Sequence, residues 1–438
     1  MEASVQVISK EIIKPSSETP THLRKLKLSY LDQLSSPTYV PIIFFYEADE
    51  LRGLNSTNQI QISQQLKQSL SNTLTVFYPL AGRIDQDGSV IDCNDAGAEF
   101  IEARVQAQLN DALQEPIIEQ LKHLAADATA GTLPGAALVA VKLTFFACGG
   151  MAIGVCVSHK LADCASVMTF LNAWAASCRG EAEFPRFSLD LANYFPAREF
   201  PDYHSPRGTN ENKIVTKRFV FAKEKLEALK QAATSPSGSN VKNPTRVEVV
   251  SAFIWKHFID VANSENRDAK KTFVAAHPVN LRGRTIPPLV LENIFGNCTM
   301  GAIAFFNASN GEFHDLVTQL RSAIKKVNED YITKARTGDN FLNEFSKLVT
   351  LLMNGEIELC AFASWCGFPL YEVDYSWGKP ISLCTSSGLP VSSCTLVNSR
   401  SGDGIEAIIN MPQDNVEILE SQIKLISSTP TQINSSTS

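Results

Sequence analysis

The chain has 438 residues, of which 44% are hydrophobic and 19% charged, with a formal net charge of −7 and a pI of about 5.6. This length and apolar content suit two or three domains with large cores. The acidic balance argues against a nucleic-acid-binding surface, which needs a basic stripe, although a local basic patch for a small anionic ligand stays compatible with it.

The targeting and cysteine patterns indicate a cytoplasmic protein. The first residues carry neither a basic stretch nor a long apolar core, so no secretory signal is expected. The most apolar runs, Val40–Tyr46 and Met151–Val157, are too short to span a bilayer. The ten cysteines form no C-x-x-C pair, which predicts reduced thiols that mostly fill the core and no metal site. No amphipathic anchor is evident, so no membrane partner is expected.

The first predicted elements alternate between strands and one helix. Val40–Tyr46 is strand-like, and Ser63–Phe77 has apolar residues at helical spacing before Pro79 ends the helix. Val90–Cys93 and Phe100–Val105 are predicted strands on either side of an Asn-Asp-Ala-Gly turn. The sequence therefore predicts a mixed α/β protein from its first hundred residues.

A hairpin and a helix follow. Ala137–Phe146 and Met151–Ser158 are strand candidates joined by a Cys-Gly-Gly turn. A helix is expected to begin at Asp163 or Cys164, with Val167, Phe170, Leu171 and Trp174 on one apolar face. Asp163 is well placed to cap this helix.

A change in composition then divides the chain. Residues 181–215 are rich in proline and polar residues and are predicted to link an N-terminal domain, 1–180, to a C-terminal domain, 216–438. Strand and helix signals resume at Lys217–Phe221. A short loop at 234–239 is expected to be mobile, and the Ser/Thr/Asn-rich tail from about residue 430 to be disordered.

Two segments match the spacing His-x-x-x-Asp, which is common by chance. His123 and Asp127 lie in a polar stretch that predicts an exposed helix end. His159 instead follows a buried strand directly and precedes a helix, a place where rigid supports hold functional side chains. A core histidine with Asp163 as an ordinary cap is the alternative, and the pattern alone leaves both open.

One histidine is enough for acyl transfer from a thioester, because the donor is already activated. A neutral imidazole accepts the alcohol proton at cytosolic pH and later returns it to the thiolate. The oxyanion of the tetrahedral intermediate needs preorganised donors. Serine hydrolase chemistry has no support, since a G-x-S-x-G elbow is absent.

The segment Ser158-His159-Lys160-Leu161-Ala162-Asp163 resembles the HxxxD motif of plant BAHD acyltransferases. A second segment, Asp374-Tyr375-Ser376-Trp377-Gly378, resembles the family's D-F-G-W-G motif at a typical interval. Supporting matches, including Gly296-Asn297 and Leu31-Asp32-Gln33, extend the similarity over nearly the whole chain and look closest to the alkaloid acetyltransferases.

This resemblance implies two chloramphenicol-acetyltransferase-like α/β domains joined by a long crossover loop, with an active-site channel between them. It implies His159 as catalytic base, and an acyl-CoA, acetyl-CoA first, as cosubstrate with no permanently bound cofactor and no metal. Asp163 is expected to pair with Arg282 in a structural role. Asp374, Trp377 and Gly378 are likewise expected to support the site, and the family pattern suggests a monomer.

The chain departs from the family pattern at four positions in one segment. Ala363 stands where a threonine linked to oxyanion stabilisation is common, which leaves Trp365, beside Ser364, as the side-chain candidate. Gly367 replaces an arginine, and Tyr375 a phenylalanine. Ser376 replaces a glycine, so a positive φ there would be strained.

Two functions follow from these observations. The first is O-acetylation of an indole alkaloid or related plant metabolite with His159 as general base. The second, motivated by the four departures, is a divergent member that binds an alkaloid or catalyses elimination or cyclisation without acyl transfer, because a shared fold does not fix the reaction. Dependence of product formation on acyl-CoA discriminates between them.

Overall fold

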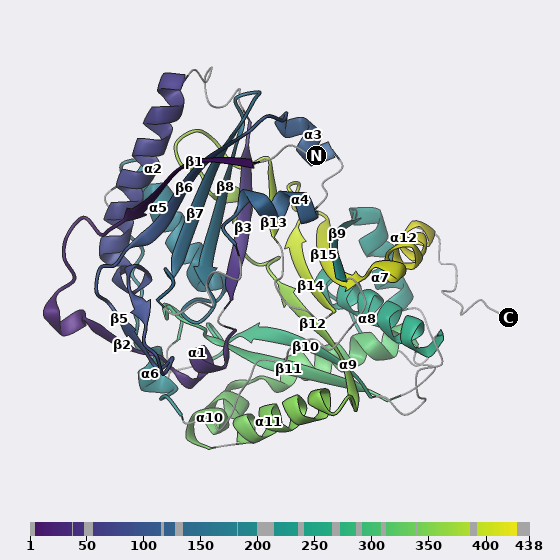
Figure 1. The fold of residues 1–438 in the computed structure, drawn as a ribbon. Coiled ribbons are helices and arrows are strands. Elements are labelled where there is room, and N and C mark those ends of the chain that lie inside the picture. Colours follow the sequence, from purple (N-terminus) through teal and green to yellow (C-terminus); the bar gives the residue numbers. More distant parts are fainter. Residues whose placement is uncertain are drawn as a thin grey trace. The chain divides into compact units, whose positions relative to one another are not determined.

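The computed structural model describes residues 5–36, 38–47, 56–114, 118–127, 135–181, 183–198, 214–234, 241–264, 272–285, 291–307, 312–338, 340–385 and 392–426. The chain forms two compact units, and each is discontinuous in sequence (Figure 1). Unit 1 comprises Met1–Tyr203, Pro287–Cys298 and Phe368–Gly388. Unit 2 comprises His204–Ile286, Thr299–Gly367 and Leu389–Ser438.

Unit 1 contains a six-stranded sheet with the order β1-β6-β7-β8-β3-β13. Only β6 and β7 are parallel to each other, and the other neighbours are antiparallel. Its strands are β1 (Val5–Ile13), β3 (Tyr39–Tyr46), β6 (Ala98–Val105), β7 (Val139–Phe146), β8 (Met151–Ser158) and β13 (Ser382–Thr385). The central strand β8 is buried along its whole length, because both faces of the sheet are covered.

Two long helices, α2 (Ser56–Val76) and α5 (Cys164–Cys178), pack together along one side of this sheet (Figure 1). Shorter elements cover the other face and share a core with it: α3 (Leu109–Gln114), α4 (Ile118–Leu121) and η3 (Lys122–Leu124). The remaining elements of unit 1 are η1 (Thr21–Leu23), α1 (Tyr30–Leu34), η2 (Tyr78–Ala81), α6 (Leu191–Tyr194) and η5 (Leu370–Glu372).

The predicted turn between Val90–Cys93 and Phe100–Val105 connects two different sheets. Strand β5 (Val90–Asp92) pairs with β2 (Lys25–Lys27) and β4 (Arg83–Ile84) in a small three-stranded sheet. Strand β6 after the turn belongs to the large sheet. Both strands are thus confirmed, but they do not pair with each other, because strand partners are set by tertiary packing rather than by the turn alone.

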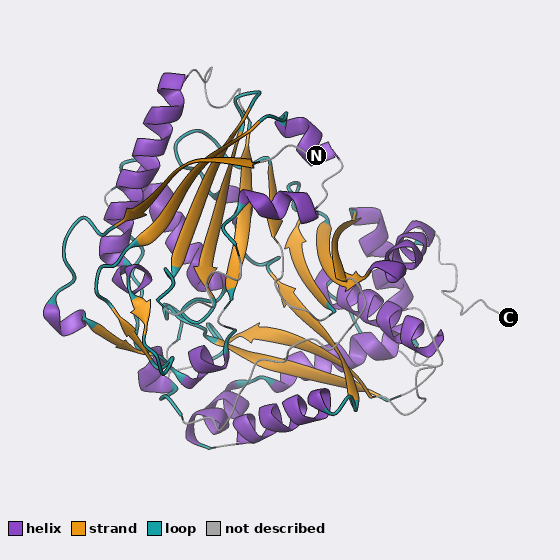
Figure 2. Cartoon of the chain, in the orientation of Figure 1, coloured by secondary structure: helices purple, strands orange, loops and turns teal. Residues whose placement is uncertain are grey.

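Unit 2 is built on a second six-stranded sheet, ordered β11-β10-β12-β14-β15-β9. Its strands are β9 (Ile214–Phe221), β10 (Thr272–Asn280), β11 (Thr299–Phe306), β12 (Ile357–Ser364), β14 (Ser393–Asn398) and β15 (Ile405–Pro412). Its helices are α7 (Lys223–Thr234), α8 (Arg246–Ser264), α9 (Phe313–Lys326), α10 (Glu329–Thr337), α11 (Asn340–Met353) and α12 (Val416–Leu425), with the short η6 (Gln413–Asn415) before α12. Figure 2 shows helices gathered against this sheet.

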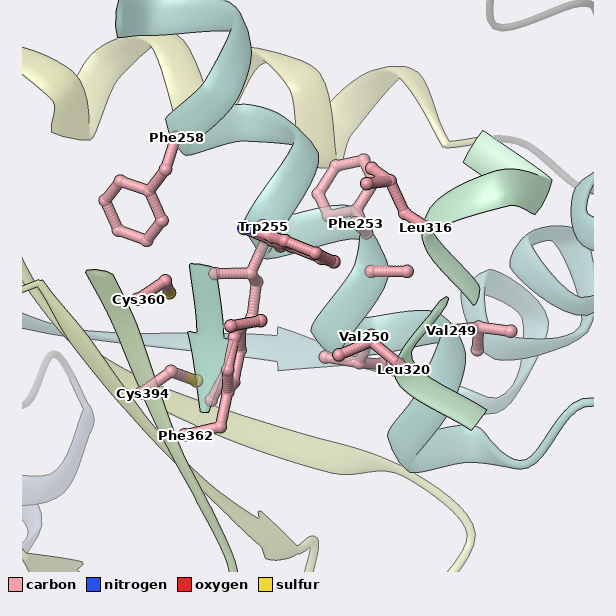
Figure 3. Packing of buried hydrophobic residues seen from close by; sticks show 14 of the residues in the cluster. Val249, Val250, Phe253, Trp255, Phe258, Leu316, Leu320, Cys360, Phe362 and Cys394 are labelled. Atoms are coloured by element: carbon pink, nitrogen blue, oxygen red, sulfur yellow. The ribbon is translucent and has the colours of Figure 1, made fainter. Parts of the chain in front are cut away.

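The core of unit 2 lies between α8 and the sheet (Figure 3). Trp255 from α8 and Phe362 from β12 are both buried in it. The thiols of Cys360 and Cys394 lie on the same side of the sheet, because Cys394 pairs with Phe362 and Cys360 lies two residues before Phe362 on the same strand. These two cysteines therefore fill the core, as the sequence predicted for most thiols.

Most of the elements predicted near the site are confirmed. Strand β8 has the predicted bounds, Met151–Ser158, and a Cys-Gly-Gly turn joins it to β7. Helix α5 begins at Cys164 with Asp163 as its N-cap. Helix α2 starts seven residues before the predicted Ser63, at Ser56.

The predicted linker is only partly within the described residues. Its stretch 183–198 contains α6 and a bridge between Ser188 and Ile294, so that part packs within unit 1. Residues 199–213, the loop after Thr234 and the predicted disordered tail lie outside the described residues. Among the described helices, none combines the length and the hydropathy that a bilayer crossing requires.

Candidate active site

His159 sits at the point where β8 leaves the sheet of unit 1. Its backbone N–H donates to the carbonyl of Thr38, and the N–H of Leu161 donates back to Ser158, which closes a tight turn before α5. The side chain is half-buried. A rigid strand on one side and a capped helix on the other thus hold the imidazole in place.

Asn297 contacts His159 twice and defines its tautomer. The Nδ2 of Asn297 donates to the His159 carbonyl at 2.7 Å and to Asp32 Oδ1 at 3.0 Å. Both partners only accept, so the amide nitrogen is assigned and Oδ1 faces His159 Nδ1, at 3.0 Å. In the neutral ring the proton therefore lies on Nδ1, and the lone pair of Nε2 is available as a base.

Behind Asn297 lies a buried carboxylate, Asp32. Its Oδ1 accepts from the backbone and side chain of Asn297, at 2.8 and 3.0 Å. Its Oδ2 accepts from the backbone and hydroxyl of Ser29, at 3.0 and 2.6 Å, in the capping box of α1. Burial raises the pKa of the Asp32 carboxyl, whereas these four hydrogen bonds act to lower it.

Asp163 joins the start of α5 to the residue after Asn297. Its Oδ1 accepts from the N–H of Ser166, the N-cap bond of the helix, at 2.9 Å. Its Oδ2 accepts from the N–H of Cys298 at 3.0 Å. The predicted capping role is confirmed, and the second bond shows that this aspartate also fixes the segment that carries Asn297.

The segment that carries Asn297 is anchored in unit 1 at further points. Ser166 Oγ exchanges hydrogen bonds with both backbone groups of Gly296, each at 2.9 Å. Gly296 has a φ of 139°, and a Cβ built there would lie 2.8 Å from Leu191, so a side chain would not fit. Phe295 packs against the ring of Phe77.

No role was predicted from the sequence for Asn297, Asp32 or Ser29. The stretches that contain Asn297 and Asp32 were noted only as supporting similarity, and Ser29 lies outside them. The capping box around Ser29 has a local signature, S-x-x-D, but the hydrogen bond between Asn297 and His159 joins residues 138 positions apart. A contact between residues so far apart in the chain leaves no periodic or spacing pattern in the sequence.

The D-Y-S-W-G segment belongs to unit 1, although it lies late in the chain. Asp374 Oδ1 accepts from the backbone N–H groups of Ser376 and Gly378, at 2.8 and 3.0 Å. Arg179, at the end of α5, donates to the Asp374 carbonyl. Trp377 is buried and packs edge-on against Tyr46. These are backbone and packing contacts of the kind expected for structural support.

Two departures from the family motif have visible consequences. Ser376 adopts a φ of 98°, a positive value at which a residue other than glycine is strained. Tyr375 is fully buried against Trp174 and Trp377, and its hydroxyl has no hydrogen-bond partner among the described residues. Burial raises the pKa of Tyr375 well above its ordinary value. Both positions therefore carry a cost that glycine and phenylalanine avoid.

The other predicted site residues lie in unit 2. Ser364 ends β12, and the buried Trp365 donates its backbone N–H to Leu396 at 2.7 Å. Arg282 follows β10, where its guanidinium donates to Asn280 Oδ1 at 3.2 Å. The pairing of Arg282 with Asp163 and the oxyanion role of Trp365 or Ser364 stay predictions. Gly367 has nothing within 4 Å of an added Cβ.

The other His-x-x-x-Asp match is an exposed surface element, as predicted. His123 lies in η3, and its side chain and that of Asp127 are exposed. Its carbonyl accepts from Lys142 at 2.8 Å, a contact that needs no histidine side chain. The surroundings, and not the spacing, thus separate the two matches.

Comparisons with known proteins agree with this arrangement. The model of the Transferase family matches residues 3–426. The chain is 42% identical to vinorine synthase from Rauvolfia serpentina, over 96% of this chain and 97% of that protein. It is 40% identical to stemmadenine O-acetyltransferase from Catharanthus roseus, with the same coverage. A crystal structure of vinorine synthase superimposes with a TM-score of 0.81 at 39% identity, covering 97% of this chain and 98% of that one.

Proposed function

The chain belongs to the Transferase family, the BAHD acyltransferases, and from that membership we propose that it is an acyl-CoA-dependent O-acetyltransferase. The observation that carries the proposal is the hydrogen bond between Asn297 and His159, which leaves His159 Nε2 able to accept a proton. Full-length similarity to an alkaloid O-acetyltransferase supports acetyl-CoA as donor and an alkaloid hydroxyl, or that of a related metabolite, as acceptor.

His159 acts as general base in the proposed reaction. Its Nε2 takes the proton of the acceptor hydroxyl while the oxygen forms a bond to the thioester carbonyl carbon. The tetrahedral intermediate then collapses, the carbon–sulfur bond breaks, and the imidazolium returns the proton to the thiolate of CoA. The reaction thus conserves protons, and the histidine is neutral again after each turnover.

The remaining predicted residues take supporting roles in this proposal. Asp163 holds the start of α5 and the N–H of Cys298, and so fixes the backbone on both sides of the site. Asp374, Trp377 and Gly378 support unit 1 by backbone and ring contacts. Trp365, with Ser364, is the candidate donor to the oxyanion, and Arg282 the candidate partner of Asp163.

We place the enzyme in the cytoplasm, where it works as a monomer. Each of the ten cysteines lies within the described residues, none of them forms a disulfide there, and seven are buried, which fits a reducing compartment. Light scattering after size-exclusion chromatography checks the oligomeric state. A mass of one chain is expected, and a stable dimer contradicts the proposal on this point.

Mass spectrometry of the purified enzyme with acetyl-CoA and a panel of hydroxylated indole alkaloids tests the function. We expect a product heavier by one acetyl group, absent without acetyl-CoA and reduced by about a thousandfold or more in His159→Ala. His123→Ala, the exposed match to the same spacing, is the matched control and keeps full activity.

Two outcomes contradict the proposal in different ways. Substantial turnover by His159→Ala removes the general-base role while leaving the acetyltransferase intact. A rearranged or eliminated alkaloid that forms without any acyl-CoA favours the divergent reaction that the four departures motivate. The donor panel includes longer acyl-CoA thioesters, so that a different acyl chain is not mistaken for an inactive enzyme.

A further inference from the structure

The buried carboxylate of Asp32 is the first charged group behind the imidazole of His159. It reaches the histidine through Asn297, whose Nδ2 donates to Asp32 Oδ1 and whose Oδ1 faces His159 Nδ1. Asp32 has only 4% of its surface exposed, and solvent therefore screens its charge weakly. All members of this chain of contacts belong to unit 1.

The hydrogen bonds of Asp32 match an ionised carboxylate. Three of its four partners are N–H groups, which can only donate: the backbone of Ser29, the backbone of Asn297 and Asn297 Nδ2. The fourth is the hydroxyl of Ser29, which already accepts from the backbone N–H of Asp32. An ionised carboxylate accepts all four bonds, whereas a proton on Oδ1 would face two N–H donors and a proton on Oδ2 would face the backbone N–H of Ser29.

We infer that Asp32 is a positioning residue of the reaction, which acts through Asn297 to orient His159 and to stabilise the imidazolium that forms when His159 takes the alcohol proton. This inference rests on the proposed function of His159. Asn297 transmits the effect because its amide dipole points its oxygen at the ring and its nitrogen at the carboxylate. A carboxylate behind the hydrogen-bond partner of a histidine raises the basicity of the ring.

Three other charged groups adjoin these elements. Lys160, next to His159, donates to the carbonyl of Gln33 at 2.5 Å, and burial lowers its pKa while Asp32 opposes that shift. Asp163 caps α5. Arg198 lies over the ring of Tyr30 in α1, at 5.4 Å. Asp32 is the one among these whose side chain bonds directly to Asn297.

Asp32→Asn tests the charge with nearly the same shape. Its side-chain oxygen can still accept from Asn297, while its amide nitrogen can donate to the hydroxyl of Ser29 but loses the bond from the Ser29 backbone N–H. Without this charge the imidazolium is less stabilised, so we expect the acid limb of the kcat profile to move to lower pH, while kcat at its plateau falls about tenfold. The NMR shifts of the His159 ring nitrogens, which report the tautomer and the hydrogen bond to Asn297, are expected to change as well.

Two further variants separate this role from a structural one. Ser29→Ala removes one hydrogen bond to Asp32 but keeps the carboxyl and its three N–H donors, and we expect a smaller shift of the acid limb than in Asp32→Asn. The double variant Asp32→Asn/Asn297→Ala is expected to have nearly the same kcat as Asn297→Ala alone, because without the Asn297 side chain Asp32 no longer connects to His159. Additive losses in the double variant overturn the inference that Asp32 acts through Asn297.

NMR of the His159 ring nitrogens keeps the inference independent of the substrate. If wild-type enzyme transfers no acetyl group, the proposed function fails, yet the ring-nitrogen shifts still report whether Asp32 acts on His159 through Asn297. Unchanged ring-nitrogen shifts in Asp32→Asn overturn the inference even when turnover falls, since a lower kcat alone also follows from a distorted fold. Circular dichroism of each variant confirms that the chain remains folded.

Discussion

The side chain of Asn297 forms two hydrogen bonds with His159: its nitrogen donates to the backbone carbonyl, and its oxygen accepts from the ring. We therefore expect Asn297→Ala to lower kcat by about 10- to 100-fold, because the ring loses both its tautomer preference and its orientation. The KM for acetyl-CoA is expected to change little, since Asn297 acts on the base. Steady-state kinetics separate the two constants, and a variant with normal kcat contradicts this role.

Asp163 is expected to matter for stability through two backbone groups at once. Asp163→Ala removes the N-cap of α5 and leaves the N–H of Cys298 without this acceptor, which costs about 2–4 kcal/mol in the free energy of unfolding. Asn328→Ala removes only the N-cap of α10, on an exposed helix, and is the matched control at about 1 kcal/mol. Urea unfolding measures both, and equal losses contradict the second role of Asp163.

Ser376 is expected to hold backbone strain that a glycine at this position would relieve. Its φ of 98° suits glycine, so Ser376→Gly should raise the free energy of unfolding by about 1 kcal/mol. The substitution also removes the Ser376 hydroxyl that accepts from Gln65 at 3.1 Å, an exposed bond of small value. Ser376→Ala removes the same bond without relieving φ, and it should not stabilise. A higher melting temperature for Ser376→Ala than for Ser376→Gly contradicts the strain argument.

Tyr375 buries a hydroxyl that has no partner among the described residues. Tyr375→Phe removes this group while keeping the ring between Trp174 and Trp377, and should stabilise the protein by about 1–2 kcal/mol. Tyr46→Phe is the matched control, because the hydroxyl of Tyr46 donates to the carbonyl of Val373 at 3.0 Å and its loss should destabilise. Thermal unfolding compares them, and destabilisation by both contradicts the orphan-hydroxyl reading of Tyr375.

His277 is expected to make the protein sensitive to mild acid. Its ring stacks on Phe362 at 4.6 Å, its Nε2 has no hydrogen-bond partner among the described residues, and burial lowers the pKa of His277 to about 4. The folded pKa is below the unfolded value of about 6.5, so between these pH values only the unfolded chain gains the proton. Stability therefore falls as the pH drops, by about 3 kcal/mol between pH 6.5 and 4.

His277→Phe should flatten that loss, since its ring cannot take up a proton in either state. Thermal unfolding at several pH values between 4.5 and 7.5 compares it with the wild type and with His123→Gln, whose side chain is exposed. If the melting temperature falls equally with pH in all three proteins, groups other than His277 cause the acid sensitivity.

The sequence predicted the parts of the site that depend on neighbours along the chain. The alternation in β8, the turn at His159 and the cap at Asp163 all lie within fifteen residues, where periodicity and capping rules apply. Asn297 was out of reach, because its partner lies 138 positions away and is found only by folding. The pairing of β5 outside the large sheet was missed for the same reason.

The predicted domains were contiguous blocks, whereas the compact units share the chain in alternating pieces. Residues 287–298 and 368–388 follow the predicted linker in sequence yet belong to unit 1. A single boundary cannot describe that exchange, because composition and proline content report where the chain leaves a unit but not where it returns.

The same interleaving limits how this family can recombine. An exchange of everything after the predicted linker between two relatives would replace Asn297 and the Asp374–Gly378 segment while keeping His159, Asp32 and Asp163. In such a hybrid, Asn297 from one relative would have to form its hydrogen bonds with Asp32 and His159 from the other relative. Working hybrids should therefore be found where five crossovers follow the boundaries between the units, and a single crossover near residue 203 should disrupt the residues that hold His159.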